Sequence, residues 1–146
     1  MSYVDNSLIT DETVVFRTRL HVVIFFAPIV LLAIAVWLFT YGVPVAAESV
    51  LAVAILWGLV KYVDYVSSEF AVTNKRVIIK VGVLRRRTVE MLNTKVEAVS
   101  VNQGLLGRIL GYGTITVSGV GGTKEAFPRI SNPLEFRRQV QASLAP

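Results

Sequence analysis

The sequence contains no cysteine and only one histidine, His21. The lack of cysteine excludes disulfides, thiolate nucleophiles and cysteine-ligated metal sites. A single histidine argues against histidine-based metal centres and catalytic triads. Glu90, Glu97 and Glu125 are the remaining candidates for acid–base chemistry, but none has a recognisable spacing to a nucleophile or a metal ligand. We therefore expect a protein that is not an enzyme and that uses no metal or cofactor.

Charge is also nearly absent from two apolar runs near the N-terminus. The run His21–Thr40 contains no acidic residue, lysine or arginine, and the run Val43–Val60 contains only Glu48. At ~1.5 Å per residue, about twenty helical residues cross the ~30 Å hydrocarbon core of a bilayer. The sequence therefore predicts two transmembrane helices, at about 21–41 and 43–64, joined by a short outer loop. A cleaved signal peptide is the competing interpretation, but the first run is too long and acidic residues precede it.

Basic residues flank the two runs on one side only. Arg17 and Arg19 precede the first run and Lys61 follows the second, whereas the connecting residues Tyr41 and Gly42 carry no basic group. Positively charged flanks are retained on the cytoplasmic side of a membrane. Both termini of this multi-pass membrane protein are therefore expected in the cytoplasm.

Glu48 is the one acidic residue within the two apolar runs. It lies within about a turn of the outer end of its helix, so we interpret it as an interfacial residue. The alternative is an ion or proton site, which would make the protein a subunit of an oligomeric channel or transporter. Small residues in both runs also favour close helix packing, within the hairpin or between copies of the chain.

After residue 66 the apolar pattern changes to the alternation of strands. Residues 13–19, TVVFRTR, have the same character and predict a strand that joins the downstream sheet, with an extension of the first helix as the alternative. The stretch GVGG at 119–122 lacks the lysine of a phosphate-binding loop and predicts a hairpin turn. Downstream strands are predicted at 69–73, 76–81, 84–92, 96–103, 114–118 and 124–127.

Two segments of the downstream domain have a different pattern. Gly104–Gly113 combines glycines with leucine and isoleucine, which predicts a compact turn whose apolar side chains fill the core. A helix is predicted at 133–144, because Asn132, Pro133 and Glu135 are typical of a helix N-terminus with a capping box. The apolar residues of this helix share one face, so we expect it to pack on the strands.

The chain resembles the bacterial membrane-flanked PH-like domains, the bPH2 group, in three stretches that follow the apolar runs. They read VTNKRVIIKVGVLRRRTVEM, VSVNQGLLGRILGYGTITVSGVGG and EAFPRISNPLEFRRQV. The resemblance implies two nearly orthogonal sheets with a helix plugging one end, anchored in a prokaryotic inner membrane, and it implies no catalytic residues. The expected organisation is a cytoplasmic arm at 1–20, a membrane α-helical hairpin at 21–66, and a PH-like barrel or sandwich of six or seven antiparallel strands with a C-terminal α-helix at 67–146.

The predicted strands place basic residues at two opposite turns. The turn after the second downstream strand is expected near the membrane, so Arg85, Arg86 and Arg87 are predicted to contact anionic lipid headgroups, with Arg85 and Arg87 on one face of a strand. Lys75 and Arg76 lie at the other turn and are expected to face a protein partner in the cytoplasm. A solvated basic face with neither role is the alternative.

These observations predict a membrane-anchored PH-like adaptor or scaffold that self-associates or holds a protein partner at the cytoplasmic leaflet. One alternative is a domain that binds anionic phospholipids and senses the inner leaflet, and another is the channel or transporter subunit. Nucleic acid is not an expected partner although the net charge is +5, because no recognition helix or aromatic stacking platform accompanies this charge.

Overall fold

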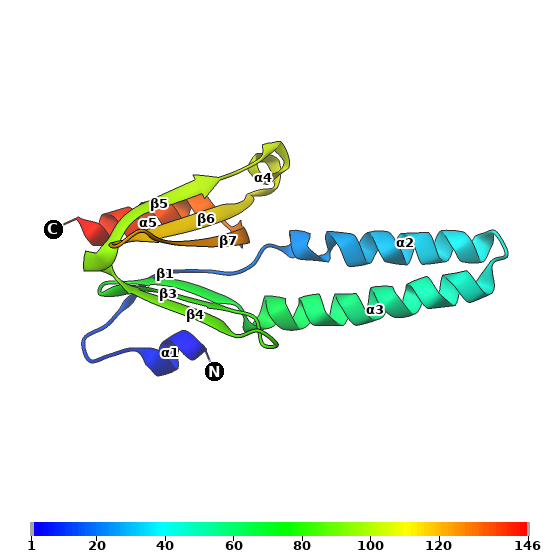
Figure 1. Ribbon diagram of the computed structural model, residues 1–146, viewed down its shortest axis with the longest axis horizontal. Coiled ribbons are helices and arrows are strands. Elements are labelled where there is room, and N and C mark those ends of the chain that lie inside the picture. The colour runs from blue at the N-terminus through cyan, green and yellow to red at the C-terminus, as the bar shows by residue number, and fades with distance from the viewer. Residues whose placement is uncertain (1, 146) are drawn as a thin grey trace. The chain divides into compact units, whose positions relative to one another are not determined.

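The computed structural model describes residues 2–145 and divides the chain into two compact units (Figure 1). The first, which we call the β unit, is built from both ends of the sequence, Met1–His21 and Ser67–Pro146. The second, the apolar hairpin, is the intervening segment Val22–Val66. The N-terminal arm therefore belongs to the same folding unit as the C-terminal domain, and the hairpin is an insertion between them.

The apolar hairpin consists of two long helices. A short 3-10 turn, η1 (Val22–Phe25), leads into α2 (Phe26–Thr40), and α3 (Pro44–Ser67) follows after a tight turn. Gly42 has a φ of 75° in this turn, a conformation that glycine adopts without steric cost. The segments Val22–Thr40 and Pro44–Ser67, of 19 and 24 residues, are long and apolar enough to cross a membrane.

Small side chains lie where the two helices approach each other. Ala35 of α2 and Ala47 and Ala54 of α3 are buried within the hairpin. A Cβ atom at Gly58 would lie 3.7 Å from Cβ of Pro28, which is ordinary van der Waals contact. Small residues allow close approach of helix backbones, as expected from the sequence.

Seven antiparallel strands form two sheets within the described residues of the β unit. The N-terminal arm contributes β1, which pairs with β2, so the arm is not an extension of the first apolar helix. The four-stranded sheet has the order β1-β2-β3-β4 and the three-stranded sheet the order β5-β6-β7. The strands are β1 (Val14–Thr18), β2 (Glu69–Thr73), β3 (Arg76–Val81), β4 (Arg87–Leu92), β5 (Val96–Asn102), β6 (Tyr112–Gly119) and β7 (Thr123–Ser131).

The two sheets are joined along both sides. On one side Leu20 forms an isolated antiparallel bridge with Ile130, and the Ser131 N–H donates to the Arg19 carbonyl at 2.9 Å. On the other side β4 continues into β5 through a single 3-10 turn, η2 (Asn93–Lys95). The resulting structure is a small sandwich of two sheets, and the seven strands within the described residues agree with the upper value predicted from the sequence.

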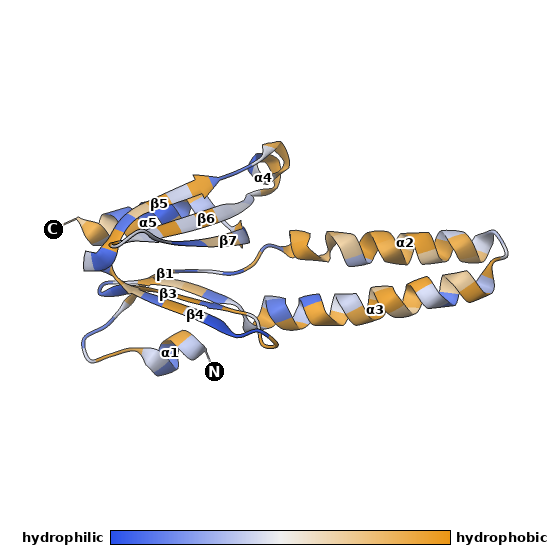
Figure 2. Ribbon diagram, in the orientation of Figure 1, coloured by the Kyte–Doolittle hydropathy of each residue, from blue (hydrophilic) through white to orange (hydrophobic). Residues whose placement is uncertain are grey.

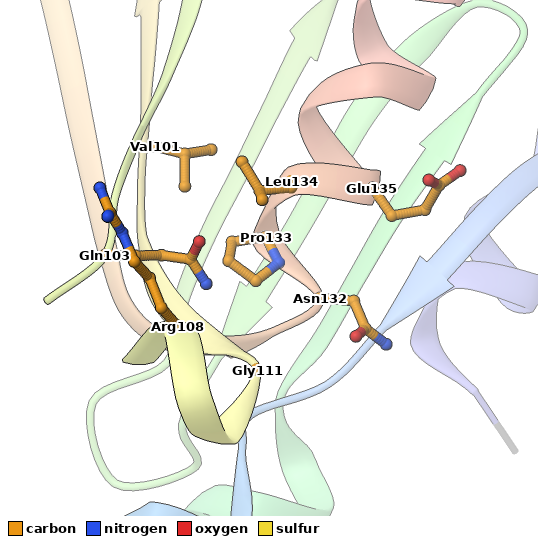
Figure 3. A pocket seen from close by; sticks show the side chains of 8 residues that line it. All are labelled: Val101, Gln103, Arg108, Gly111, Asn132, Pro133, Leu134 and Glu135. Carbon is orange, nitrogen blue, oxygen red and sulfur yellow. The ribbon is translucent and has the colours of Figure 1, made fainter. Parts of the chain in front are cut away.

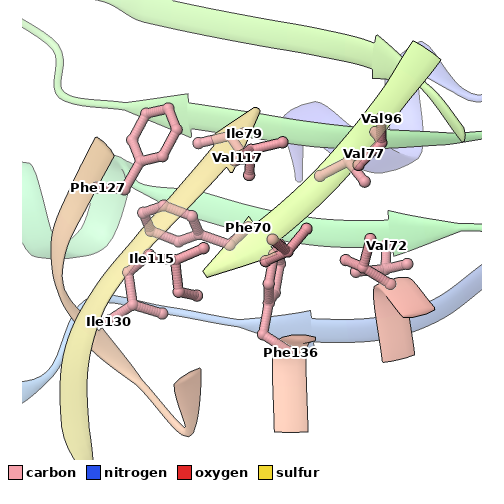
Figure 4. Close-up of a cluster of buried hydrophobic side chains, with 12 residues drawn as sticks. Phe70, Val72, Val77, Ile79, Val96, Ile115, Val117, Phe127, Ile130 and Phe136 are labelled. Carbon is pink, nitrogen blue, oxygen red and sulfur yellow. The ribbon is translucent and has the colours of Figure 1, made fainter. Parts of the chain in front are cut away.

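The core lies between the sheets and is closed by the C-terminal helix α5 (Pro133–Leu144) (Figure 4). Phe70 of β2 meets Phe127 of β7 edge to face, with ring centroids 6.0 Å apart. Each fully buried large apolar side chain contributes about 1.5–3 kcal/mol relative to exposure. The buried core residues are Phe70, Val72, Val77, Ile79, Val96, Val99, Ile115, Val117, Phe127, Ile130, Phe136 and Val140.

The predicted bounds of α5 are correct, but its predicted capping box is wrong. Asn132 has φ 50° and ψ 52° and makes no side-chain cap hydrogen bond. Asparagine tolerates this left-handed conformation better than most residues, which explains its presence before the helix. Glu135 instead accepts a hydrogen bond from the Gln139 side chain at 2.6 Å. Pro133 still begins the helix, as its fixed φ favours.

The prediction that the leucines of the glycine-rich segment fill the core is wrong. This segment forms a short helix, α4 (Leu105–Leu110), which packs through its glycine. A Cβ atom at Gly107 would lie only 2.5 Å from the Tyr112 carbonyl oxygen, so only glycine allows this approach. The large apolar side chains consequently point away from the core: Leu105, Leu106, Ile109 and Leu110 are 81%, 65%, 79% and 52% exposed.

Candidate functional site

Strand β3 connects the two basic sites that the sequence predicts. The β2–β3 turn, Asn74–Lys75, lies at one end of the β unit, which we call the closed end. The β3–β4 loop, Gly82–Arg86, lies at the opposite end together with α4, and we call this the open end (Figure 1). The two ends differ in what their charged and apolar side chains contact.

Arg76 at the closed end is held by two carboxylates. Its Nε donates to Glu12 at 3.0 Å and its terminal nitrogen donates to Glu90 at 2.6 Å. The Arg76 side chain is only 12% exposed and the Glu12 side chain is fully buried. The Thr73 hydroxyl also donates to Glu12, at 2.7 Å. The N-terminal arm and β4 thus supply acidic partners to Arg76, and a contact of Arg76 with a partner protein stays a prediction.

The Glu12 carboxylate is stabilised in its charged form. Burial alone raises the pKa of Glu12, but hydrogen bonds from Arg76, the Ile9 N–H and Thr73 outweigh it and lower the pKa below its ordinary value. Hydrogen bonding to Glu12 correspondingly raises the pKa of Arg76. Both groups remain charged at neutral pH, and this ion pair fastens the arm to the β2–β3 turn.

The remainder of the closed end is also tied to the arm. Lys75 is exposed, and its Nζ donates to the Thr10 carbonyl at 2.7 Å. Asn74 accepts from the Thr13 N–H at 3.0 Å and donates to the Asp11 carbonyl at 3.1 Å. A partner contact through Lys75 stays a prediction.

The first helix, α1 (Tyr3–Ser7), was not predicted from the sequence, and it covers the outer face of the four-stranded sheet. Val4 packs there with Ala71 and Ile78 in a second buried cluster. The Glu69 carboxylate accepts from the Ser2 hydroxyl and from the N–H groups of residues 3 and 4 at 2.6–3.2 Å. Although burial raises the pKa of Glu69, these hydrogen bonds lower it overall.

The three arginines of the open end have different surroundings. Arg85 lies in the turn and forms no hydrogen bond or ion pair with a described residue. Arg86 lies 5.1 Å from the Tyr3 ring centroid. Arg87 begins β4, pairs with the Glu125 carboxylate and lies 5.6 Å from the Phe127 ring centroid. The expected strand from residue 84 is thus shorter, and Arg85 and Arg87 do not share a strand face.

Apolar residues accompany these arginines. Val83 and Leu84, which precede them, are 53% and 79% exposed. Gly82 has a φ of 74°, and its N–H donates at 3.3 Å to the hydroxyl of Ser68, the residue directly after α3. The first residue of the loop is therefore held by a hydrogen bond, and the exposed residues that follow are both apolar and basic.

A groove of about 660 Å³ lies between the end of β5 and the start of α5 (Figure 3). Gln103 forms part of its wall, and its side-chain amide donates to the Tyr112 carbonyl at 3.0 Å. β5 is an edge strand, so one row of its backbone groups is not paired within the sheet. The groove joins segments far apart in the sequence, and no local pattern predicted it. Its lining residues are Val101, Gln103, Arg108, Gly111, Asn132, Pro133, Leu134 and Glu135.

Glu48 lies on the exposed surface of α3, beside an apolar hollow of about 240 Å³ within the hairpin. Ala35 and Phe39 of α2 and Leu51 of α3 contribute to this hollow. No ion pair to Glu48 is present among residues 2–145. An ion or proton role for Glu48, and with it the channel or transporter interpretation, stays a prediction.

The described residues form two antiparallel sheets closed by a C-terminal helix, and an apolar helical hairpin is inserted between the first and second strands. This arrangement defines a PH-like protein with two candidate membrane helices. The chain belongs to the bacterial PH domain family, whose family model matches residues 8–144. This match confirms the resemblance drawn from the three sequence stretches. No curated protein and no solved structure matches the chain. Within the described residues, no three histidine, aspartate or glutamate side chains form a cluster that could hold a metal ion.

Proposed function

We propose that the protein is a membrane-anchored adaptor without catalytic activity, whose β unit holds an extended segment of a partner protein beside β5. The observation that carries this proposal is the groove between the unpaired edge of β5 and the start of α5. An extended peptide adds to an exposed sheet edge through main-chain hydrogen bonds, and adjacent pockets select its side chains.

The groove contains both apolar and charged side chains that a bound peptide would contact. Leu134 is 53% exposed and Val101 is partly buried, which provides an apolar surface for one side chain of the peptide. Arg108 and Glu135 lie at the margins and offer charges of both signs. The apolar hairpin would hold this groove at the cytoplasmic leaflet, since basic residues flank both of its helices on the same side.

The experiment is a selection of random peptides against the full chain in lipid nanodiscs. We expect selected peptides to bind about tenfold more weakly, or about 1.4 kcal/mol, when Leu134→Asp places a carboxylate at the apolar part of the groove. The matched control is Val120→Asp, which alters an exposed residue of the β6–β7 turn away from the groove. Peptides that bind the Leu134→Asp variant as well as the wild type would contradict the proposal.

Anionic lipid recognition is a second candidate, which the open end favours. Arg85 and Arg86 are exposed, and their loop is hydrogen-bonded to the residue that follows α3. Each basic residue near an anionic leaflet contributes about 1 kcal/mol of attraction. Arg87 contributes less to this attraction, because its charge is already paired with Glu125.

Because the chain lacks cysteine, a single fluorophore at Val83→Cys reports on this loop without background labelling. We expect its emission to shift to shorter wavelength in nanodiscs with anionic lipid relative to nanodiscs with neutral lipid. The double variant Arg85→Ala/Arg86→Ala should abolish that difference. An equal emission in both lipid compositions for the wild-type loop would exclude charge-dependent lipid contact.

A further inference from the structure

The outer side of α4 is an exposed apolar surface that the fold does not cover. Leu105, Leu106 and Ile109 are each more than half exposed, and Arg108 is the one charged residue of the helix. Figure 2 shows hydrophobic residues along α4 and at the tip of the β3–β4 loop. Soluble proteins rarely expose contiguous apolar patches, and those that do use them for protein or membrane contacts.

The orientation of α4 is fixed by backbone contacts. The Gly111 N–H donates to the Gly107 carbonyl at 2.8 Å, and the Asn132 N–H donates to the Gly111 carbonyl at 3.0 Å. Gly107 packs against the Tyr112 backbone so closely that no side chain fits there. A rotation that buried the leucines would break these contacts, so their exposure is a property of the fold.

The open end also contains both points at which the chain passes between the β unit and the apolar hairpin. His21, the last residue of the β unit before the hairpin, stacks near Tyr112 with ring centroids 5.2 Å apart. The backbone N–H of His21 donates to the Arg129 carbonyl at 2.7 Å. Ser68, directly after α3, accepts from the Gly82 N–H. The exposed apolar residues therefore lie at the same end of the β unit as its two chain connections to the apolar hairpin.

We infer that α4 inserts its apolar side into the interfacial layer of the bilayer that the hairpin crosses, with Val83 and Leu84 as a second insertion point. The lipid phosphates would then lie level with Arg108, Arg85 and Arg86. The leucines would enter the boundary of the acyl chains by about 5–10 Å, as in interfacial helices. This inference rests on the membrane anchoring in the proposed function. The bilayer is the proposed occupant because the exposed apolar residues lie at the same end of the β unit as His21 and Ser68, which lead into and out of the hairpin.

The test uses single-cysteine variants of the full chain, labelled with an environment-sensitive fluorophore in nanodiscs that contain spin-labelled lipids. We expect a label at Ile109→Cys to emit at short wavelength and to lose fluorescence with lipids that carry the quencher near the headgroup. The matched control is Val120→Cys, which is also exposed but lies at the other end of β6 from α4 and should not be quenched.

A third label at Val36→Cys in α2 tests the anchoring separately, because it should be quenched by lipids that carry the spin label along the acyl chain. Quenching at Val36 without quenching at Ile109 would overturn the inference and leave the anchoring intact. A lack of quenching at both positions would overturn both. Short-wavelength emission at Ile109 without lipid quenching would mean that protein, in a second copy or a partner, covers α4, and this too would overturn the inference.

Discussion

The two ends of the β unit contain similar residues but use them in opposite ways. At the closed end, Arg76 is enclosed by Glu12 and Glu90, and the N-terminal arm covers the turn. At the open end, Arg85 and Leu84 have no such cover. A basic residue at a turn is therefore held in an ion pair or left exposed according to whether a distant segment supplies an acidic partner.

Of the substitutions that test the difference between the two ends, Arg76→Ala should destabilise the β unit most. Removing one partner of a buried ion pair leaves the Glu12 carboxylate without a cationic partner and costs about 3–5 kcal/mol. The measurement is the free energy of opening of β2 and β3, obtained from amide hydrogen exchange. Arg85→Ala is the matched control and should change this free energy by less than about 0.5 kcal/mol. Equal effects of the two variants would contradict the distinction between the ends.

Gly107→Ala tests whether the outward orientation of α4 is fixed. The new Cβ atom would overlap the Tyr112 carbonyl oxygen, so we expect a destabilisation of about 1–3 kcal/mol or a displaced α4. Amide exchange of residues 105–113 measures this effect. Gly104→Ala is the control, because nothing lies within 4 Å of a Cβ atom at that position. Identical exchange in the two variants would show that α4 is not clamped.

The N-terminal arm, which Glu12 and Glu69 hold in place, should also be more sensitive to acid than strand β6. The folded-state pKa values of Glu12 and Glu69 are lowered, so their stabilisation is fully present above the ordinary carboxyl pKa of 4.5. It is lost as the pH falls below that value through the folded-state pKa values. We expect residues 2–13 to lose amide protection in this range before β6 does. A Glu12→Gln variant should show a smaller pH dependence, and protection of the arm that is unchanged down to pH 3 would contradict the account.

The smallest effect is expected for Lys75→Ala. This variant removes one exposed hydrogen bond to the Thr10 carbonyl and should cost less than about 0.5 kcal/mol. Hydrogen exchange of the arm gives the value directly. A cost as large as that of Arg76→Ala would mean that Lys75 is part of the buried network and not an exposed neighbour of it.

The sequence predicted the strands and α5 well because their burial follows local periodicity. The inward residues of β6 alternate with outward polar ones, and the buried residues of α5 recur at helical spacing. Local periodicity did not predict the orientation of α4, because a sequence of leucines beside glycines is the same whether the leucines face the core or the solvent. The close approach of Gly107 to Tyr112 decides the orientation, and it is a tertiary contact.

The candidate sites were predictable only where they are formed by neighbouring residues. The exposed basic loop was found from consecutive arginines, although the start of β4 was misplaced. The partner of Arg76 was missed because Glu12 lies 64 residues away in the sequence. The groove beside β5 was missed for the same reason, since its two walls come from separate segments that meet only in the folded unit.

In the membrane contact that we propose, the β unit turns its open end, and not its closed end, toward the bilayer. The most direct test is electron paramagnetic resonance of nitroxides at Leu84→Cys and Lys75→Cys in the full chain in nanodiscs. We predict that the Leu84 label collides mainly with oxygen, which concentrates in lipid, and the Lys75 label mainly with a water-soluble nickel chelate. Equal access of the nickel chelate to both labels would contradict the claim.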